Sequence, residues 1–235
     1  TDAGDDIEIG GTEYQRERYD LSYGFRTGGT EVEAFVGRLD TQDTGTPALP
    51  MDIDYIESDL AGMNFNTLVN DVRIKGHVAY GHVDHIMTNF AMRAPASPMI
   101  FRATQAIGRN LAYGLQAGIP LAEGEFTLGF DANEVIHDSD ISNPNQAMFL
   151  IKNFNNSERN SYGVFAQWKG DWGNIQLESG IRYNLVDMDS NSVSSSGMMG
   201  MMGMNAGNLA NRFNQADRNE QYDNFDIVLK ASRPI

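Results

Sequence analysis

Apolar and polar residues alternate along almost the whole chain, with the period of two that marks a β-strand whose faces meet different surroundings. In the stretch NIQLESGIRYNL, Ile175, Leu177, Ile181, Tyr183 and Leu185 share one face, whereas the other face carries Gln176, Glu178, Arg182 and Asn184. The stretches EFTLGFDANEVIH and NLAYGLQAGI repeat the pattern. Helical spacing fits these segments badly, so the pattern predicts an all-β protein.

Nine strands follow from this pattern. Their predicted ranges are 13–26, 30–40, 55–67, 72–87, 108–119, 124–137, 159–170, 174–189 and 220–234. Tight turns follow the first, third, fifth and seventh strands, and long connections follow the others. The last long connection, 190–219, contains SSSGMMGMMGMNAGN and is predicted to be a low-complexity loop. Short turns at one end and long loops at the other predict an antiparallel up-and-down sheet.

The polar face is too polar for a dry core. It carries charged and amide side chains on several strands: Arg16, Arg18, Asp20, Arg73, Lys75, Gln176, Glu178 and Arg182. Burying such charges unpaired would cost several kcal/mol each. The strands also exceed the ~9–11 residues that a transmembrane strand needs. Tyr162, Trp168 and Tyr222, near strand ends, fit an aromatic girdle.

These patterns predict a transmembrane β-barrel segment with a wet or plugged lumen inside and lipid outside. Nine is an odd number of strands with no evident closure. We therefore expect residues 1–235 to form part of a larger barrel, with the remaining strands outside this chain.

Composition narrows the functional classes. The chain has 32 acidic and 17 basic residues, a net charge of -15, which disfavours binding to nucleic acid. It has no cysteine and no run of 18 apolar residues that would form a membrane-spanning helix. Phosphate-binding, zinc-protease and nucleophile-elbow motifs are absent from the sequence, so no enzymatic activity is expected.

One long segment carries a family resemblance. The stretch NSYGVFAQWKGDWGNIQLESGIRYNLVDMDSN resembles the TonB-dependent receptors of Gram-negative outer membranes. Two others, PALPMDIDYIESDLAG and HVDHIMTNFAMRAPASPM, look like the branch of TonB-dependent copper receptors. The resemblance implies an outer-membrane location, a large plugged barrel made by one chain, contact with outer-membrane lipid, and energy supplied by the TonB complex through a plug. No plug domain has a counterpart in this sequence.

A pair of soft donors stands near the end of the fourth predicted strand. His85 and Met87 are two residues apart, so in extended chain they point the same way, together with Lys75 and His77. Imidazole and thioether together favour copper, especially Cu(I), over hard ions. The alternative is two ordinary residues in a loop. The resemblance implies that copper receptors hold their metal with such a His-x-Met pair plus a cysteine and a methionine from the plug.

A second group of soft donors lies in the connection 190–219. It consists of Met198, Met199, Met201, Met202 and Met204. Thioethers separated by glycines could collect Cu(I) at the cell surface, or they could belong to a sequence-tolerant loop. Met51, Met92 and Met99 stand in predicted outer loops, where each alone is better explained by packing.

Three functions remain open from the sequence. The first is an outer-membrane receptor that binds and imports copper. The second keeps the fold and changes the cargo to a siderophore or another nutrient. The third is a soluble β-rich surface module, which would share the alternation and the acidic charge.

Overall fold

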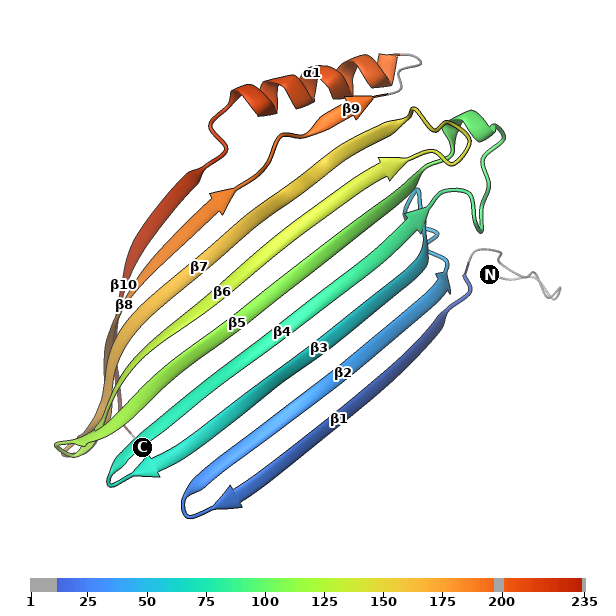
Figure 1. Cartoon of the computed structure of the whole chain (residues 1–235). Helices are drawn as coiled ribbons and strands as arrows, with labels where there is room; N and C mark the ends of the chain where they lie inside the picture. Colours follow the sequence, from blue (N-terminus) through green and yellow to red (C-terminus); the bar gives the residue numbers. More distant parts are fainter. Residues whose placement is uncertain (1–11, 197–200, 234–235) are drawn as a thin grey trace, which may run out of the picture.

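The computed structural model describes residues 12–196 and 201–233. Within them, ten strands form one sheet, with a single-turn helix and one α-helix outside it. Figure 1 shows the strands running side by side in chain order. Their bounds are β1 Gln15–Thr27, β2 Thr30–Thr44, β3 Asp52–Val69, β4 Val72–Thr88, η1 Pro98–Ile100, β5 Ala103–Leu121, β6 Gly124–Ser142, β7 Leu150–Trp172, β8 Ile175–Asp189, β9 Ser194–Ser196, α1 Met201–Gln215 and β10 Glu220–Ser232.

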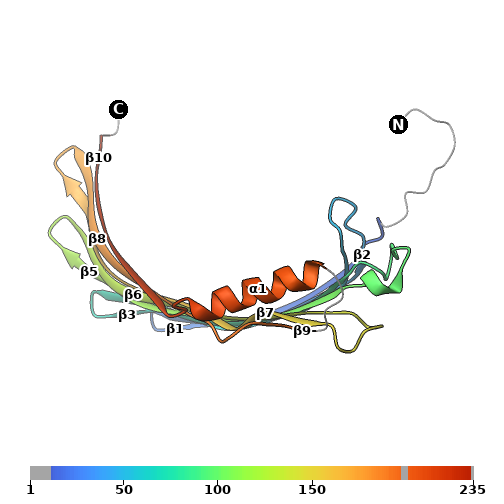
Figure 2. The ribbon, with the colours of Figure 1, turned by 90° about the horizontal axis from the view of Figure 1, so that it is seen from above.

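The sheet has up-and-down topology. Each long strand pairs antiparallel with the next, and the spatial order is β1 to β8 followed by β10. In the described residues, β1 pairs with β2 alone and β10 with β8 alone, so both edges are open. Seen from above, the sheet curves like an open trough (Figure 2). These features confirm the antiparallel, sequential and curved sheet expected from the sequence.

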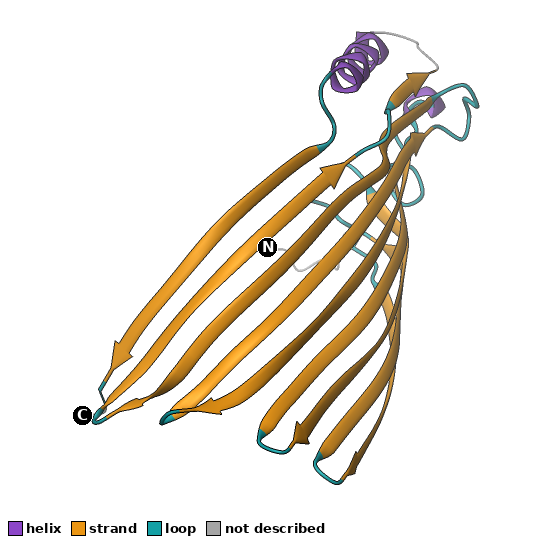
Figure 3. Cartoon of the chain, turned by 60° about the vertical axis from the view of Figure 1, so that its left-hand side comes forward, coloured by secondary structure: helices purple, strands orange, loops and turns teal. Residues whose placement is uncertain are grey.

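The connections at one end, called the turn end, are two-residue hairpins. Gly28, Gly29, Asn70, Ala122 and Gly173 adopt positive φ there, between 53° and 87°. Left-handed residues match the right-handed twist of the strands that they join, which is why such turns suit tight hairpins. Figure 3 shows these turns together at one end and the long loops at the other, called the loop end. The predicted separation of turns from loops is confirmed.

The outer face of the sheet is apolar. Leu128 and Ile181, on this face, are 55% and 50% exposed, and among described residues Ala132 is the one buried apolar side chain. The sheet therefore has no hydrophobic core of its own. By ladder parity, six apolar residues of the alternating stretches lie on this face: Leu111, Leu115, Phe126, Leu128, Ile175 and Leu177.

The apolar surface forms a band. On β4 it runs from Val72 to Tyr80, and on β5 from Leu111 to Ile119. Eight residue steps cover about 27 Å along a strand and about 20 Å across a membrane at the usual strand tilt. Beyond the band, toward the loop end, the outer face becomes charged at Arg38 and its ladder neighbours. This height is slightly less than the apolar band of about 25 Å that outer-membrane barrels carry.

The structure departs from the sequence prediction at the loop end. β7 begins at Leu150 rather than 159, and β5 at Ala103 rather than 108, because polar strands projecting past the band show weak alternation. The connection 190–219 is not an irregular loop: it contains β9 and α1. Met, Leu, Ala and Gln favour helix, and the Asn214 amide fixes α1 by bonding both the N–H and the carbonyl of Val193, at 2.9 and 2.8 Å.

Candidate metal site

The pair singled out in the sequence lies at the loop end of β4. β4 pairs with β5 without a break from Arg73 to Thr88, so successive side chains keep alternating between the faces. His85 and Met87 therefore share the inner face, and both are half-buried. The common direction expected from their spacing is present. Metal binding by the pair stays a prediction.

The ladder neighbours of this pair are mostly apolar. His85 stands between Ile56 and Ala106. Met87 stands between Ile53 and Thr104, because a β-bulge in β3 shifts the register between Ile53 and Tyr55. Without the bulge, the carboxylate of Asp54 would stand opposite Met87. The bulge thus leaves the two soft donors without a carboxylate in their own ladder rows, which disfavours hard ions such as Ca²⁺.

The pair also lies above the apolar band. His82, on the outer face of the same strand, belongs to the first charged row, where it pairs with Asp59 and Arg109. His85 is three residues further toward the loop end, about 10 Å along the strand. The candidate site therefore lies at the loop end of the trough, which we call its mouth, and beyond the level of the lipid.

A buried ion pair fixes the loops around the site. Asp52 is 1% exposed, and Arg93 donates from Nε to its Oδ2 at 2.8 Å and from Nη2 to its Oδ1 at 2.7 Å. Arg93 Nη2 also donates to the carbonyls of Thr46 and Leu49, at 3.1 and 3.0 Å. The guanidinium of Arg93 lowers the pKa of the Asp52 carboxyl from its ordinary value, so Asp52 stays ionised. The loop 45–51 is thereby joined to the loop 89–102.

Asparagines fix the second loop. Asn89 closes the loop 89–102 by accepting from the Arg102 N–H at 2.8 Å and donating to the Ile100 carbonyl at 3.0 Å. Asn143, 3% exposed, donates to the carbonyls of Pro98 and Met99 at 3.1 and 3.0 Å. Sequence reasoning missed Arg93 and Asn143, because nothing in the pattern reveals which loop residue will meet a partner about 40 residues away.

The methionine tract lies partly outside the described residues. Met198 and Met199 lie outside the described residues, and Met201, Met202 and Met204 begin α1, where their side chains are not described. In the described ranges, no three His, Cys, Asp or Glu side chains are grouped so as to hold a metal ion.

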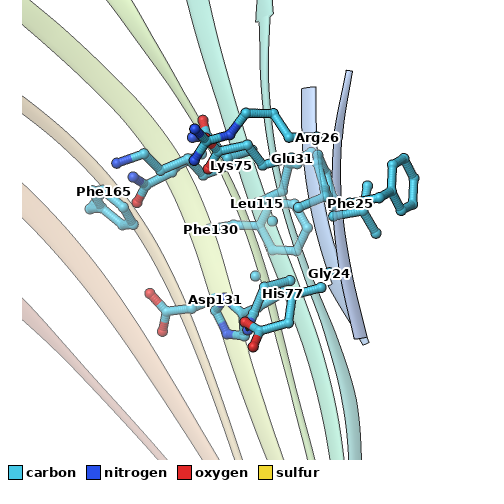
Figure 4. Close-up of a pocket in the computed structure, with 18 of the residues that line it drawn as sticks. Gly24, Phe25, Arg26, Glu31, Lys75, His77, Leu115, Phe130, Asp131 and Phe165 are labelled. Carbon is cyan, nitrogen blue, oxygen red and sulfur yellow. The ribbon is translucent and has the colours of Figure 1, made fainter. Parts of the chain in front are cut away.

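A second polar region lies lower on the inner face. A hollow of about 970 Å³ reaches from β1 to β8, which only the concave side of one sheet allows. Figure 4 shows Lys75, His77 and Asp131 among its lining residues. His77 and His85 are about 27 Å apart along β4, so they cannot bind one ion. Charged side chains of the inner face, among them Lys75, Asp131 and Arg182, thus line this hollow.

A curved wall with an apolar outer band and a charged inner face is characteristic of transmembrane β-barrels. The chain belongs to the TonB dependent receptor-like, beta-barrel family, whose sequence model matches residues 1–225. This membership implies an outer-membrane location and gives no support to the soluble surface module. The family is one of receptors and transporters rather than enzymes.

Among solved structures, the chain is similar to one described as the copper transporter OprC, with a TM-score of 0.77 and 17% sequence identity. The match covers 96% of this chain and 36% of that one, so this chain spans about a third of the length of OprC. At this identity the likeness establishes the fold. No curated protein matches the chain in sequence. Within the described residues, no helix has the length and hydropathy to cross a membrane.

Proposed function

We propose that this chain forms part of an outer-membrane receptor that binds copper, as Cu(I), through His85 and Met87 and imports it with energy from the TonB complex. The observation that carries the proposal is the pair itself: two soft donors on one inner face, with mostly apolar ladder neighbours, at the mouth of the trough. The fold shared with a structure described as a copper transporter supports the cargo.

Each donor has a defined role. Imidazole binds as the neutral base and thioether as a neutral soft donor, so a monovalent soft ion gains two ligands without a buried negative charge. Two ligands bind weakly, and we propose that a plug supplies the remaining donors and the contact with TonB, in a barrel made by one chain. The methionines 198–204 could deliver the ion to the mouth of the trough, as a secondary and separate proposal.

The test uses the intact receptor. We would replace His85→Ala and Met87→Ala, singly and together, and measure bound copper by elemental analysis after purification. Each single change should weaken copper binding at least about tenfold, equivalent to about 1.4 kcal/mol. His82→Ala, on the opposite face of the same strand, and Met63→Ala, 41% exposed on the outer face of β3, are the matched controls.

Several outcomes would overturn the assignment. Undiminished copper in the double variant would remove the site from β4. Copper lost only after removal of the methionines 198–204 would move it to the connection before β10. Uptake of a ferric siderophore, with no copper uptake, would favour the alternative cargo. Equal copper uptake in cells with and without TonB would contradict the TonB-dependent mechanism.

A further inference from the structure

A third sulfur lies beside the candidate pair. Met51, in the loop before β3, is half-buried, and the Thr104 hydroxyl lies 3.6 Å from its Sδ. Thr104 is the ladder partner of Met87 and shares its inner face. The sequence alone favours packing for Met51, because nothing in it places this residue near His85 and Met87.

The path of Met51 across the sheet fixes where its sulfur lies. Met51 immediately precedes β3, Thr104 belongs to β5, and β4 runs between them. Neighbouring strands are about 4.8 Å apart, so a residue at the start of β3 can place its side chain against one on β5 only across the end of β4. Asp52, the next residue, pairs with Thr88, the residue after Met87. The Met51 thioether therefore crosses β4 at the level of Met87.

The backbone of Met51 is held on both sides. Its carbonyl accepts a hydrogen bond from the Thr46 hydroxyl, and the Thr46 N–H donates to Asp52 Oδ1 at 2.7 Å. Asp52 in turn forms an ion pair with Arg93. An ion-paired, almost completely buried carboxylate next to Met51 leaves its backbone little freedom, whereas its three side-chain torsions still let the sulfur adjust.

We propose that Met51 is a third, thioether ligand of the soft-metal site, and that Asp52 and Arg93 are positioning residues that hold it over Met87. The proposal rests on the copper site proposed for His85 and Met87. It extends the share of the ligands that this chain supplies to one imidazole and two thioethers. The Thr104 hydroxyl donates only weakly to sulfur, and a lone pair of Sδ remains for a metal. No carboxylate joins the set, so the selectivity is for soft monovalent ions.

The first measurement is affinity in the intact receptor. Met51→Leu keeps the volume and removes the sulfur, and we expect it to weaken Cu(I) and Ag(I) binding about tenfold without changing the folded-barrel mobility on unheated SDS gels. Met99→Leu is the control, since Met99 is also a loop methionine, with its Sδ 3.0 Å from Gln146 Nε2. It should bind both ions as the parent does.

The second measurement counts ligands. X-ray absorption at the copper edge should show one fewer sulfur neighbour in Met51→Leu than in the parent. Arg93→Gln, which keeps all three donors, should weaken binding yet leave the sulfur count unchanged. If Met51→Leu left the copper affinity and the sulfur count unchanged while His85→Ala still lost copper, Met51 would not be a ligand, and the site proposed for His85 and Met87 would stand. Copper retained in His85→Ala and Met87→Ala would instead refute the site on which the proposal rests.

Discussion

Arg182 on β8 reaches across β7 and grips Asp131 on β6 with two hydrogen bonds, Nη1 to Oδ2 at 2.8 Å and Nη2 to Oδ1 at 2.6 Å. The path is open because Gly163 lies beneath it: a Cβ built there would stand 2.0 Å from Nη2. Both side chains are over a third exposed in the hollow, so the pair stabilises the wall modestly.

Gly163→Ala should push Arg182 off Asp131 and lower the unfolding free energy by about 1 kcal/mol. Urea titration of the barrel in lipid vesicles measures this loss. The same substitution in an Arg182→Gln background should cost clearly less, because the ion pair is already gone. An equal loss of unfolding free energy in both backgrounds would show that Gly163 is needed for the strand itself and not for the Arg182–Asp131 ion pair.

The apolar band predicts a depth-dependent cost of charge on the outer face. Val164, 55% exposed, lies in the middle row of the band, so Val164→Arg should destabilise the folded receptor by about 2–4 kcal/mol. Ile136 lies in the charged row beside Arg109 and Glu158, so Ile136→Arg should cost about 1 kcal/mol or less. Similar costs at the two depths would contradict the placement of the membrane.

A strained hairpin offers a stabilising change. Ala122 adopts a φ of 56° in the turn between β5 and β6, a conformation that costs alanine about 1–2 kcal/mol. Ala122→Gly should raise the unfolding free energy by up to about 1 kcal/mol, because the added freedom of the unfolded chain offsets part of the relief. Ala112→Gly, inside β5, should do the reverse. Urea titration of both variants compares the two effects.

The Asp52–Arg93 pair should control the order of the loop end. Arg93→Gln leaves a nearly inaccessible carboxylate without its cation, which should cost about 1–3 kcal/mol because Arg93 is a third exposed and Asp52 keeps its bond from the Thr46 N–H. We expect faster proteolysis and hydrogen exchange in the loops 45–51 and 89–102, with β6 to β8 unchanged. Adding Asp52→Asn should restore part of the protection. Unchanged exchange in Arg93→Gln would show that the ion pair does not order these loops, and that Asn89 and Asn143 suffice for the loop 89–102.

The sequence determined the wall of the barrel. Its period-two alternation follows directly from the strand geometry, so the faces of Leu115, Leu128 and Ile181 could be assigned without coordinates. Glycine and asparagine at the hairpin turns marked the turn end. For the same reason, His85 and Met87 could be placed on one inner face: their spacing alone fixes their relative direction in a strand.

Only the tertiary structure decided what surrounds that pair. The bulge that removes Asp54 from the ladder row of Met87 shifts the register by one residue, which alternation within a single strand does not encode. The approach of Met51 to Thr104 and the burial of Asp52 against Arg93 join residues 53 and 41 positions apart through loops without periodicity. Local repetition specifies strands and faces, whereas contacts between loops depend on how neighbouring strands align, and that alignment exists only once the sheet has formed.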